Sequence, residues 1–146
     1  MIVWAFRRWV QGLRHNDGRH WTMIGKEFQR HLGAPDGVHA FAGFARMADA
    51  LQRRGRRVMR VHQVCCPRLS ADELCLVGLV AACQAPTPSA ARARAEWLVR
   101  SEGIGELLEA GARLAMLMRN HDLTLPQRAA GGSTGSDTAV RSMTIH

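Results

Sequence analysis

The stretch SADELCLVGLVAACQ, residues 70–84, decides the fold because it predicts a helix at the centre of the protein. Ser70 and Glu73 have the spacing of a capping box, in which the serine hydroxyl accepts a hydrogen bond from the Glu73 amide and the glutamate reaches back to the serine amide. From Leu74 onward the stretch is apolar on almost every face. A helix without a polar face has to be covered by other helices, so we expect it to form the core.

The amino-terminal part of the chain predicts three further helices. Apolar residues recur at i, i+3, i+4 and i+7 over residues 2–14, and the same spacing resumes from Trp21 to Leu32. A third helix is expected to begin with Asp36 as its N-cap and to end at Gly55. Each of these helices has one apolar face, which can pack against the central helix.

Two more helices are expected after the central one. Thr87 or Ser89 is placed to cap a fifth helix, which Gly103 is expected to end. A sixth is predicted over residues 104–119, with arginine near its carboxyl end, where positive charge suits the helix dipole. About six helices joined by short connections indicate an orthogonal or bundle-like all-α fold.

The connections divide the chain into one domain and a tail. Residues 56–69 lack helical periodicity, contain several valines and reach a proline, so we expect an extended loop there and no sheet. From residue 126 the chain is rich in Gly, Ser and Thr. We therefore expect a compact helical domain over residues 1–125 and a disordered tail over residues 126–146.

The composition is typical of a globular protein that keeps its thiols reduced. Apolar residues make up 47% of the 146 residues and charged residues 22%. The longest apolar run, residues 74–83, is about half the roughly 20 residues that cross a bilayer. The amino terminus lacks the order of a secretory signal. We therefore expect a cytoplasmic protein with free cysteines, of the size and composition of a small bacterial accessory protein.

Positive charge is concentrated in the first half of the chain. Residues 1–68 carry 13 basic and 4 acidic side chains, whereas residues 69–146 carry 7 and 8. The ratio of 19 arginines to one lysine indicates GC-rich coding, so the number of arginines by itself is weak evidence of function. Their uneven distribution predicts an electric field that attracts an acidic partner.

The densest basic cluster is LQRRGRRVMR, residues 51–60. The candidate binding residues are Arg53, Arg54, Arg56, Arg57 and Arg60, together with Arg7 and Arg8 on the polar face of the first helix. The guanidinium group is a planar fork that matches carboxylates and phosphates. We therefore expect a non-catalytic adaptor or regulatory protein that binds an acidic protein surface through this patch.

Other interpretations of the same arginines remain open. A nucleic-acid-binding regulator would use them on phosphates and would show a steep salt dependence. A helix-turn-helix fits poorly, because the loop GAPDG contains a proline and the following helix carries core aromatics. The cluster is also compatible with a solvated helix end, or with arginines that fold against Glu102, Glu106 and Glu109.

A cysteine-based redox, metal or haem sensor is a further alternative. Its candidate residues are His62, Cys65, Cys66 and Cys75. Cys65 and Cys66 are adjacent and lie among arginines, whose charge favours the thiolate. Cys75 and Cys83 are separated by about 12 Å along one helix, which is too far for both to ligate one zinc ion.

No pattern of catalytic residues is present in the sequence. It contains no HExxH, no GxGxxG after a strand and no GxxxxGK[ST], so we expect neither an enzyme nor a cofactor. The first helix, with Trp4, Phe6 and Trp9 among arginines, also has the composition of an interfacial membrane helix. Its apolar stripe is equally suited to packing on the core or on a partner, which is the interpretation that we favour over peripheral membrane contact.

Overall fold

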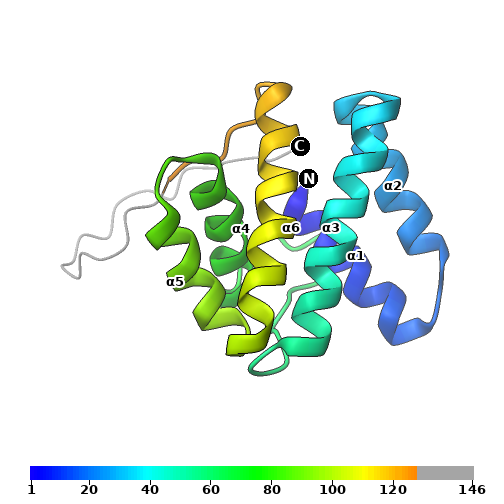
Figure 1. Cartoon of the computed structure of the whole chain (residues 1–146). Coiled ribbons are helices and arrows are strands. Elements are labelled where there is room, and N and C mark those ends of the chain that lie inside the picture. The colour runs from blue at the N-terminus through cyan, green and yellow to red at the C-terminus, as the bar shows by residue number, and fades with distance from the viewer. Residues whose placement is uncertain (128–146) are drawn as a thin grey trace.

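The computed structural model describes residues 1–127 and forms a compact bundle of six α-helices (Figure 1). The helices are α1 (Ile2–His15), α2 (Arg19–Leu32), α3 (Ala34–Arg54), α4 (Ala71–Gln84), α5 (Pro88–Leu98) and α6 (Ser101–Asn120). The described residues contain no strand, so the predicted all-α fold is confirmed. None of these six helices is long and apolar enough to reach across a membrane. The disordered tail predicted over residues 126–146 lies, except for its first two residues, outside the described part of the chain.

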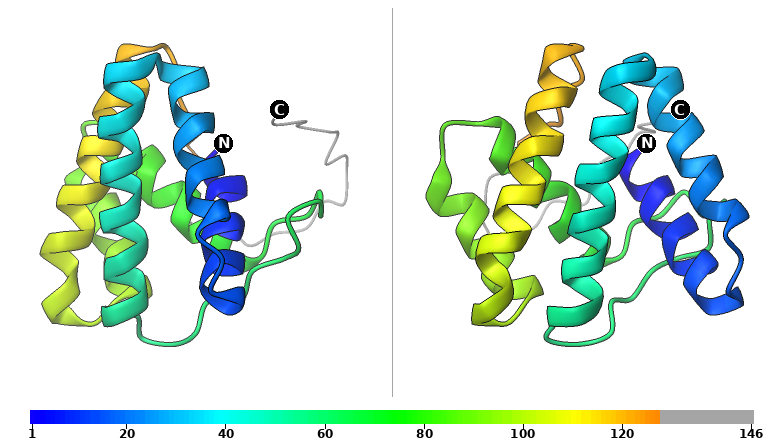
Figure 2. Two further views of the ribbon diagram at one scale, coloured as in Figure 1. Left: turned by 90° about the vertical axis from the view of Figure 1, so that its right-hand side faces the viewer. Right: turned by 45° about the vertical axis from the view of Figure 1, so that its right-hand side comes forward.

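Two long helices form the middle of the bundle. α3 and α6 lie side by side, with α1 and α2 on one side of them and α4 and α5 on the other (Figures 1 and 2). All six helices contribute side chains to one cluster of buried apolar residues. The α3–α6 contact therefore joins the two sides of the bundle.

α4 begins where the sequence predicts and has the predicted cap. The Glu73 amide donates to Ser70 Oγ at 3.1 Å, and the Ser70 amide donates to Glu73 Oε2 at 2.8 Å. Leu76, Leu79 and Val80 are fully buried against neighbouring helices. The helix predicted from residues 70–84 is confirmed, but its predicted central position is wrong, because α4 lies to one side of the α3–α6 pair.

Two predicted helix boundaries are wrong. α3 begins at Ala34, so Asp36 lies in the first turn of the helix and is not its N-cap. Gly33, with a φ of 75°, lets the chain turn directly from α2 into α3. Gly103 does not end α5, since it lies in the first turn of α6, where a Cβ atom would stand 2.6 Å from Arg54 Cβ. This glycine allows α3 and α6 to approach closely.

The extended connection predicted over residues 56–69 is present, and it starts beside the α5–α6 connection. The Arg56 amide donates to the Leu98 carbonyl at 3.1 Å, and the Arg100 amide donates to the Arg54 carbonyl at 2.9 Å. Gly55 and Val99 form an isolated antiparallel β-bridge at this point. These bonds fix the end of α3 against the start of α6.

The guanidinium group of Arg7 is inside the protein, which contradicts the prediction that it belongs to an exposed basic patch. Arg7 is 3% exposed, and its Nε and Nη2 donate to the two carboxylate oxygens of Glu73 at 2.6 and 2.9 Å. Its other hydrogen bonds go to the carbonyls of Gln63 (3.0 Å), Cys66 (2.6 Å) and Arg68 (2.6 Å). All five N–H donors of an arginine are thereby used.

Glu73 is the shared acceptor of this network. It is fully buried, and it accepts from Arg7, from the Ser70 amide and from the His62 amide. Burial raises the pKa of Glu73, but the hydrogen bonds from Arg7 and the two amides outweigh it, so the net pKa lies below the ordinary value for a glutamate. We call Arg7, Glu73 and the three carbonyls that Arg7 binds the Arg7 clamp.

Replacing Arg7 should destabilise the protein strongly. Arg7→Met leaves the buried Glu73 carboxylate and three carbonyls without their donor, so we expect the free energy of unfolding to fall by about 3–5 kcal/mol. Urea denaturation measures this change. Arg14→Met, on the exposed face of the same helix, is the control and should change stability by less than about 0.5 kcal/mol. Equal effects of the two substitutions would contradict the structural role of Arg7.

The Arg7 clamp should also make the stability of the fold depend on pH in the acidic range. Because the pKa of Glu73 is lower in the folded protein than in the unfolded chain, its ionisation stabilises the fold fully above the unfolded pKa of about 4.3. That contribution is lost as the pH falls through the folded pKa. Glu73→Gln should therefore show a shallower loss of stability between about pH 5 and pH 3 than the wild type. Urea titrations at several pH values measure the free energy of unfolding of both proteins. If it falls equally with pH in the two, Glu73 contributes nothing to the acid sensitivity.

Candidate functional site

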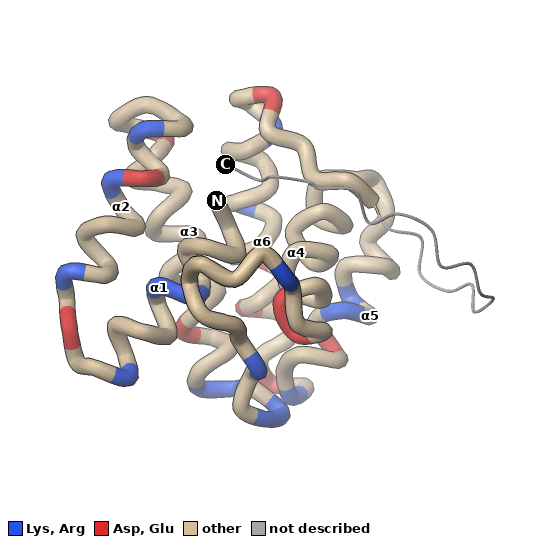
Figure 3. The backbone as a smooth tube through the Cα atoms, turned by 180° about the vertical axis from the view of Figure 1, so that it is seen from behind, with Lys and Arg blue, Asp and Glu red and all other residues tan. Residues whose placement is uncertain are grey.

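The fold gathers arginines from two distant segments at one end of the bundle. The bridge between the end of α3 and residue 99 brings Arg100 alongside the cluster predicted at residues 53–60. We call this surface the basic end, and its members are Arg53, Arg54, Arg56, Arg57, Arg60 and Arg100. Figure 3 shows Lys and Arg segments at the lower end of the tube, with Asp and Glu segments close to them.

Two of these arginines form ion pairs with carboxylates of the same chain, although nearly half of each side chain remains exposed. Arg53 Nη2 lies 2.6 Å from Asp49 Oδ2 and 2.8 Å from Glu106 Oε1, so it links α3 to α6. Arg57 Nη2 pairs with Asp72 Oδ1 at the start of α4. The interpretation that the cluster folds against acidic residues therefore holds for part of it, with Glu106 as one of the acids that the sequence suggested.

Arg57 also stacks on an exposed tryptophan. Its guanidinium carbon lies 4.1 Å from the centroid of the Trp97 ring. Trp97 lies on α5 and is 43% exposed. The sequence analysis did not identify it as a site residue. Its position outside the apolar stripe of the helix is the signal that could have done so. Asp72 and Trp97 together hold the Arg57 side chain in one place.

The remaining arginines of the basic end are open to solvent. Arg54, Arg56, Arg60 and Arg100 are exposed, and none of them forms an ion pair with a carboxylate within residues 1–127. Arg56 Nε donates only to the Glu96 carbonyl, at 2.6 Å. Arg100 could not be assigned to this surface from the sequence, because its position depends on the pairing between two connections. These four side chains provide positive charge that the described residues leave uncompensated.

Arg8 does not belong to the basic end. It is half-buried on α1, and its guanidinium lies 5.3 Å from the centroid of the Trp4 ring in the preceding turn. With Arg7 inside the Arg7 clamp, neither of the two α1 arginines predicted for the patch reaches it. The basic end therefore comes from α3, the connection after it and Arg100, which is the N-cap residue of α6.

The structure separates most of the predicted thiol and imidazole cluster. Cys65 is exposed in a turn closed by the Cys66 amide, which donates to the Gln63 carbonyl at 3.0 Å. His62 is exposed and contacts Glu73 through its backbone amide, while Cys75 is half-buried on α4. Within the described part of the chain, no group of three or more His, Cys, Asp or Glu side chains is placed to hold a metal ion. Of the four predicted residues, Cys65 and His62 are exposed, whereas Cys66 and Cys75 are partly buried.

Comparison of the chain with protein-family models, with curated proteins and with solved structures finds no match. Its function therefore has to be inferred from the chemistry of its surfaces. The basic end offers fixed and free guanidinium groups, an exposed indole and the side chain of Val58, which is 88% exposed. Arginine and tryptophan are the residue types that contribute most binding energy in protein interfaces.

The four thiols should differ in reactivity. Burial raises the pKa of Cys75 to about 11 and also raises the pKa of Cys83, so both are thiols at neutral pH. We expect Cys65 to react first with an aromatic disulfide reagent at pH 7.5, and Cys75 and Cys83 to react only slowly. Absorbance of the released thiolate measures the rates. A Cys65→Ser variant that keeps the fast phase would contradict this assignment.

Proposed function

We propose that the protein is a non-catalytic helical adaptor or regulatory module that binds an acidic surface of a partner protein through its basic end. One observation carries this proposal: Arg57 is held on the exposed face of Trp97, next to four arginines that lack carboxylate partners among residues 1–127. The formal net charge of +8 supports it, because it speeds the approach of an acidic partner.

The arrangement of the basic end favours tight binding. Arg57 and Trp97 are already held in position by each other and by Asp72, so a ligand that contacts them pays little side-chain entropy. Arg54 and Arg56 extend from the same rigid helix end, whose backbone is tied to Leu98 and Arg100. The backbone that carries these arginines is therefore fixed, and Arg57 presents its guanidinium group in one place.

A protein partner fits this surface better than nucleic acid does. Val58 and Trp97 expose apolar area beside the arginines, which suits apolar side chains of a partner. Glu96, Glu102 and Glu106 lie on the adjoining turns of α5 and α6, and carboxylates repel a continuous chain of phosphates. A protein surface, in contrast, can place its acidic groups only where the arginines are free.

Charge reversal at the basic end should strongly weaken binding to an acidic probe. The probe is a fluorescein-labelled peptide of glutamates and leucines, and its binding is followed by fluorescence anisotropy. The variant Arg54→Glu, Arg56→Glu, Arg60→Glu should bind roughly 100-fold more weakly, because attraction becomes repulsion at three places. Trp97→Ala should weaken binding about tenfold through the loss of a central contact.

The control is a triple variant with the same change of net charge at positions outside the basic end. Arg14→Glu, Arg19→Glu, Lys26→Glu reverses three exposed cations on α1 and α2 and should reduce affinity much less. Similar losses in the two triple variants would mean that net charge alone drives binding, and the basic end would have no special role. Labelled single-stranded DNA and RNA, titrated at two salt concentrations, test the alternative partner. Binding of these probes more tightly than the peptide, with a steep salt dependence, would replace the protein partner by nucleic acid.

A further inference from the structure

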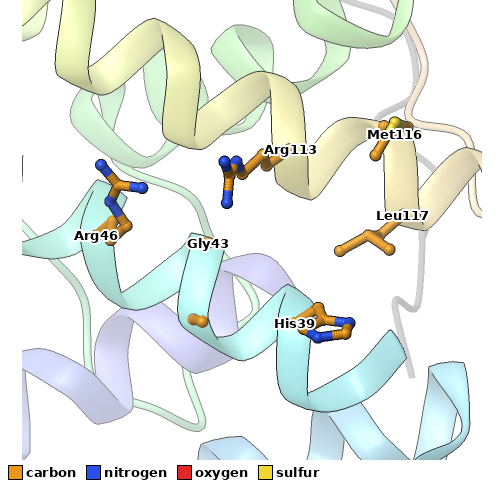
Figure 4. A pocket seen from close by; sticks show the side chains of 7 residues that line it. His39, Gly43, Arg46, Arg113, Met116 and Leu117 are labelled. Carbon is orange, nitrogen blue, oxygen red and sulfur yellow. The ribbon is translucent and has the colours of Figure 1, made fainter. Parts of the chain in front are cut away.

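A groove lies between α3 and α6, on the two helices that join the sides of the bundle. It has a volume of about 390 Å³. Its lining residues are His39, Ala42, Gly43, Arg46, Arg113, Met116 and Leu117. Figure 4 shows the side chains of Arg46 and Arg113 directed into the space between the two helices, with His39 and Leu117 farther along it.

The floor and one wall of the groove are apolar. Ala42 and Gly43 supply small residues on α3; α6 approaches Gly43 closely, since a Cβ atom there would lie 3.6 Å from the Ala110 carbonyl oxygen, whereas Ala42 is exposed. Met116 on α6 is 55% exposed and stands at the edge with Leu117 beside it. Methionine adapts its shape to different apolar ligands and is frequent on surfaces that bind helices.

The charges of the groove are positive and only weakly compensated. Arg46 Nη1 and Arg113 Nη2 both lie 3.8 Å from the same oxygen of Glu109, which is too long for a hydrogen bond. Two exposed guanidinium groups thus share one exposed carboxylate, and the site keeps a net positive charge. A carboxylate from a ligand can approach both arginines more closely than Glu109 does.

We propose that this groove binds an acidic amphipathic helix of the partner protein, with apolar side chains on Ala42, Met116 and Leu117 and carboxylates on Arg46 and Arg113. The inference rests on the proposed function, since it describes the form of the same acidic partner. The side chains of both arginines are half or more exposed, so a small molecule would remain largely in water. A partner helix that lies on the surface, over the line of contact between α3 and α6, covers them.

The groove leads toward the basic end. Arg46 and Arg53 are two turns apart on α3, about 10 Å, and Arg53 is bonded to Glu106 on the facing helix. A partner helix of three or four turns that lies along the groove therefore reaches the basic end. Its acidic residues would then meet Arg46 and Arg113 first and Arg54 and Arg56 at its far end.

Two labelled peptides test the inference. The ordered peptide places leucines and glutamates on opposite faces of a helix, and the scrambled peptide has the same composition without such faces. Ala42→Trp fills the groove from an exposed position, and Arg46→Gln, Arg113→Gln removes its charges. We expect Ala42→Trp to weaken binding of the ordered peptide about tenfold or more. Binding of the scrambled peptide should not change.

The controls separate this inference from the proposed function. Thr22→Trp, an exposed position on α2, should bind both peptides as the wild type does, and circular dichroism checks that each variant is folded. The proposal that the groove binds a helix is wrong if Ala42→Trp binds the ordered peptide as tightly as the wild type does. It is also wrong if the wild type binds the two peptides equally. If only the Arg54, Arg56, Arg60 reversal weakens binding, the basic end is the site and the groove is not. If only Ala42→Trp and the Gln variant weaken it, the groove binds the helix and the basic end does not.

Discussion

The buried ion pair between Arg7 and Glu73 is the interaction on which the arrangement of this protein depends. Taking both charges out of water costs several kcal/mol per ion, and the structure offsets that cost by giving every N–H of the guanidinium an acceptor. The pair connects α1 to α4 and also holds the carbonyls of the loop between α3 and α4. One side chain of α1 thus fixes a loop and a helix start that lie 56 to 66 residues later in the chain.

The same carboxylate links the cap of α4 to the position of the basic end. Glu73 completes the capping box with Ser70 and accepts from the His62 amide, so the helix start and the loop are held together. Its neighbour Asp72, also buried, pairs with Arg57 and accepts from the Arg60 amide at 2.6 Å. Two adjacent acids at one helix start therefore place the loop that carries half of the basic end.

The parts of the fold that could be predicted are those encoded within a few residues. The start of α4 follows from the spacing of Ser70 and Glu73, and the helices follow from their apolar periodicity. The role of Arg7 depends on a carboxylate 66 residues away, and an arginine between Phe6 and Trp9 has the same local pattern whether it is exposed or buried. Arg100 and Trp97 were missed for the same reason, since only the pairing of two connections brings them to the cluster.

The structure also changes what the excess of positive charge means for binding. Arg53 joins α3 to α6, and Arg57 joins the connection after α3 to α4, whereas Arg54, Arg56 and Arg100 leave their charge in solvent. Free guanidinium groups are consequently interspersed with carboxylates that belong to the fold. A ligand with continuous negative charge meets repulsion at those carboxylates, while a ligand with spaced acidic groups avoids it. Under the proposed function, the spacing of the charges therefore matters more for the choice of partner than their total.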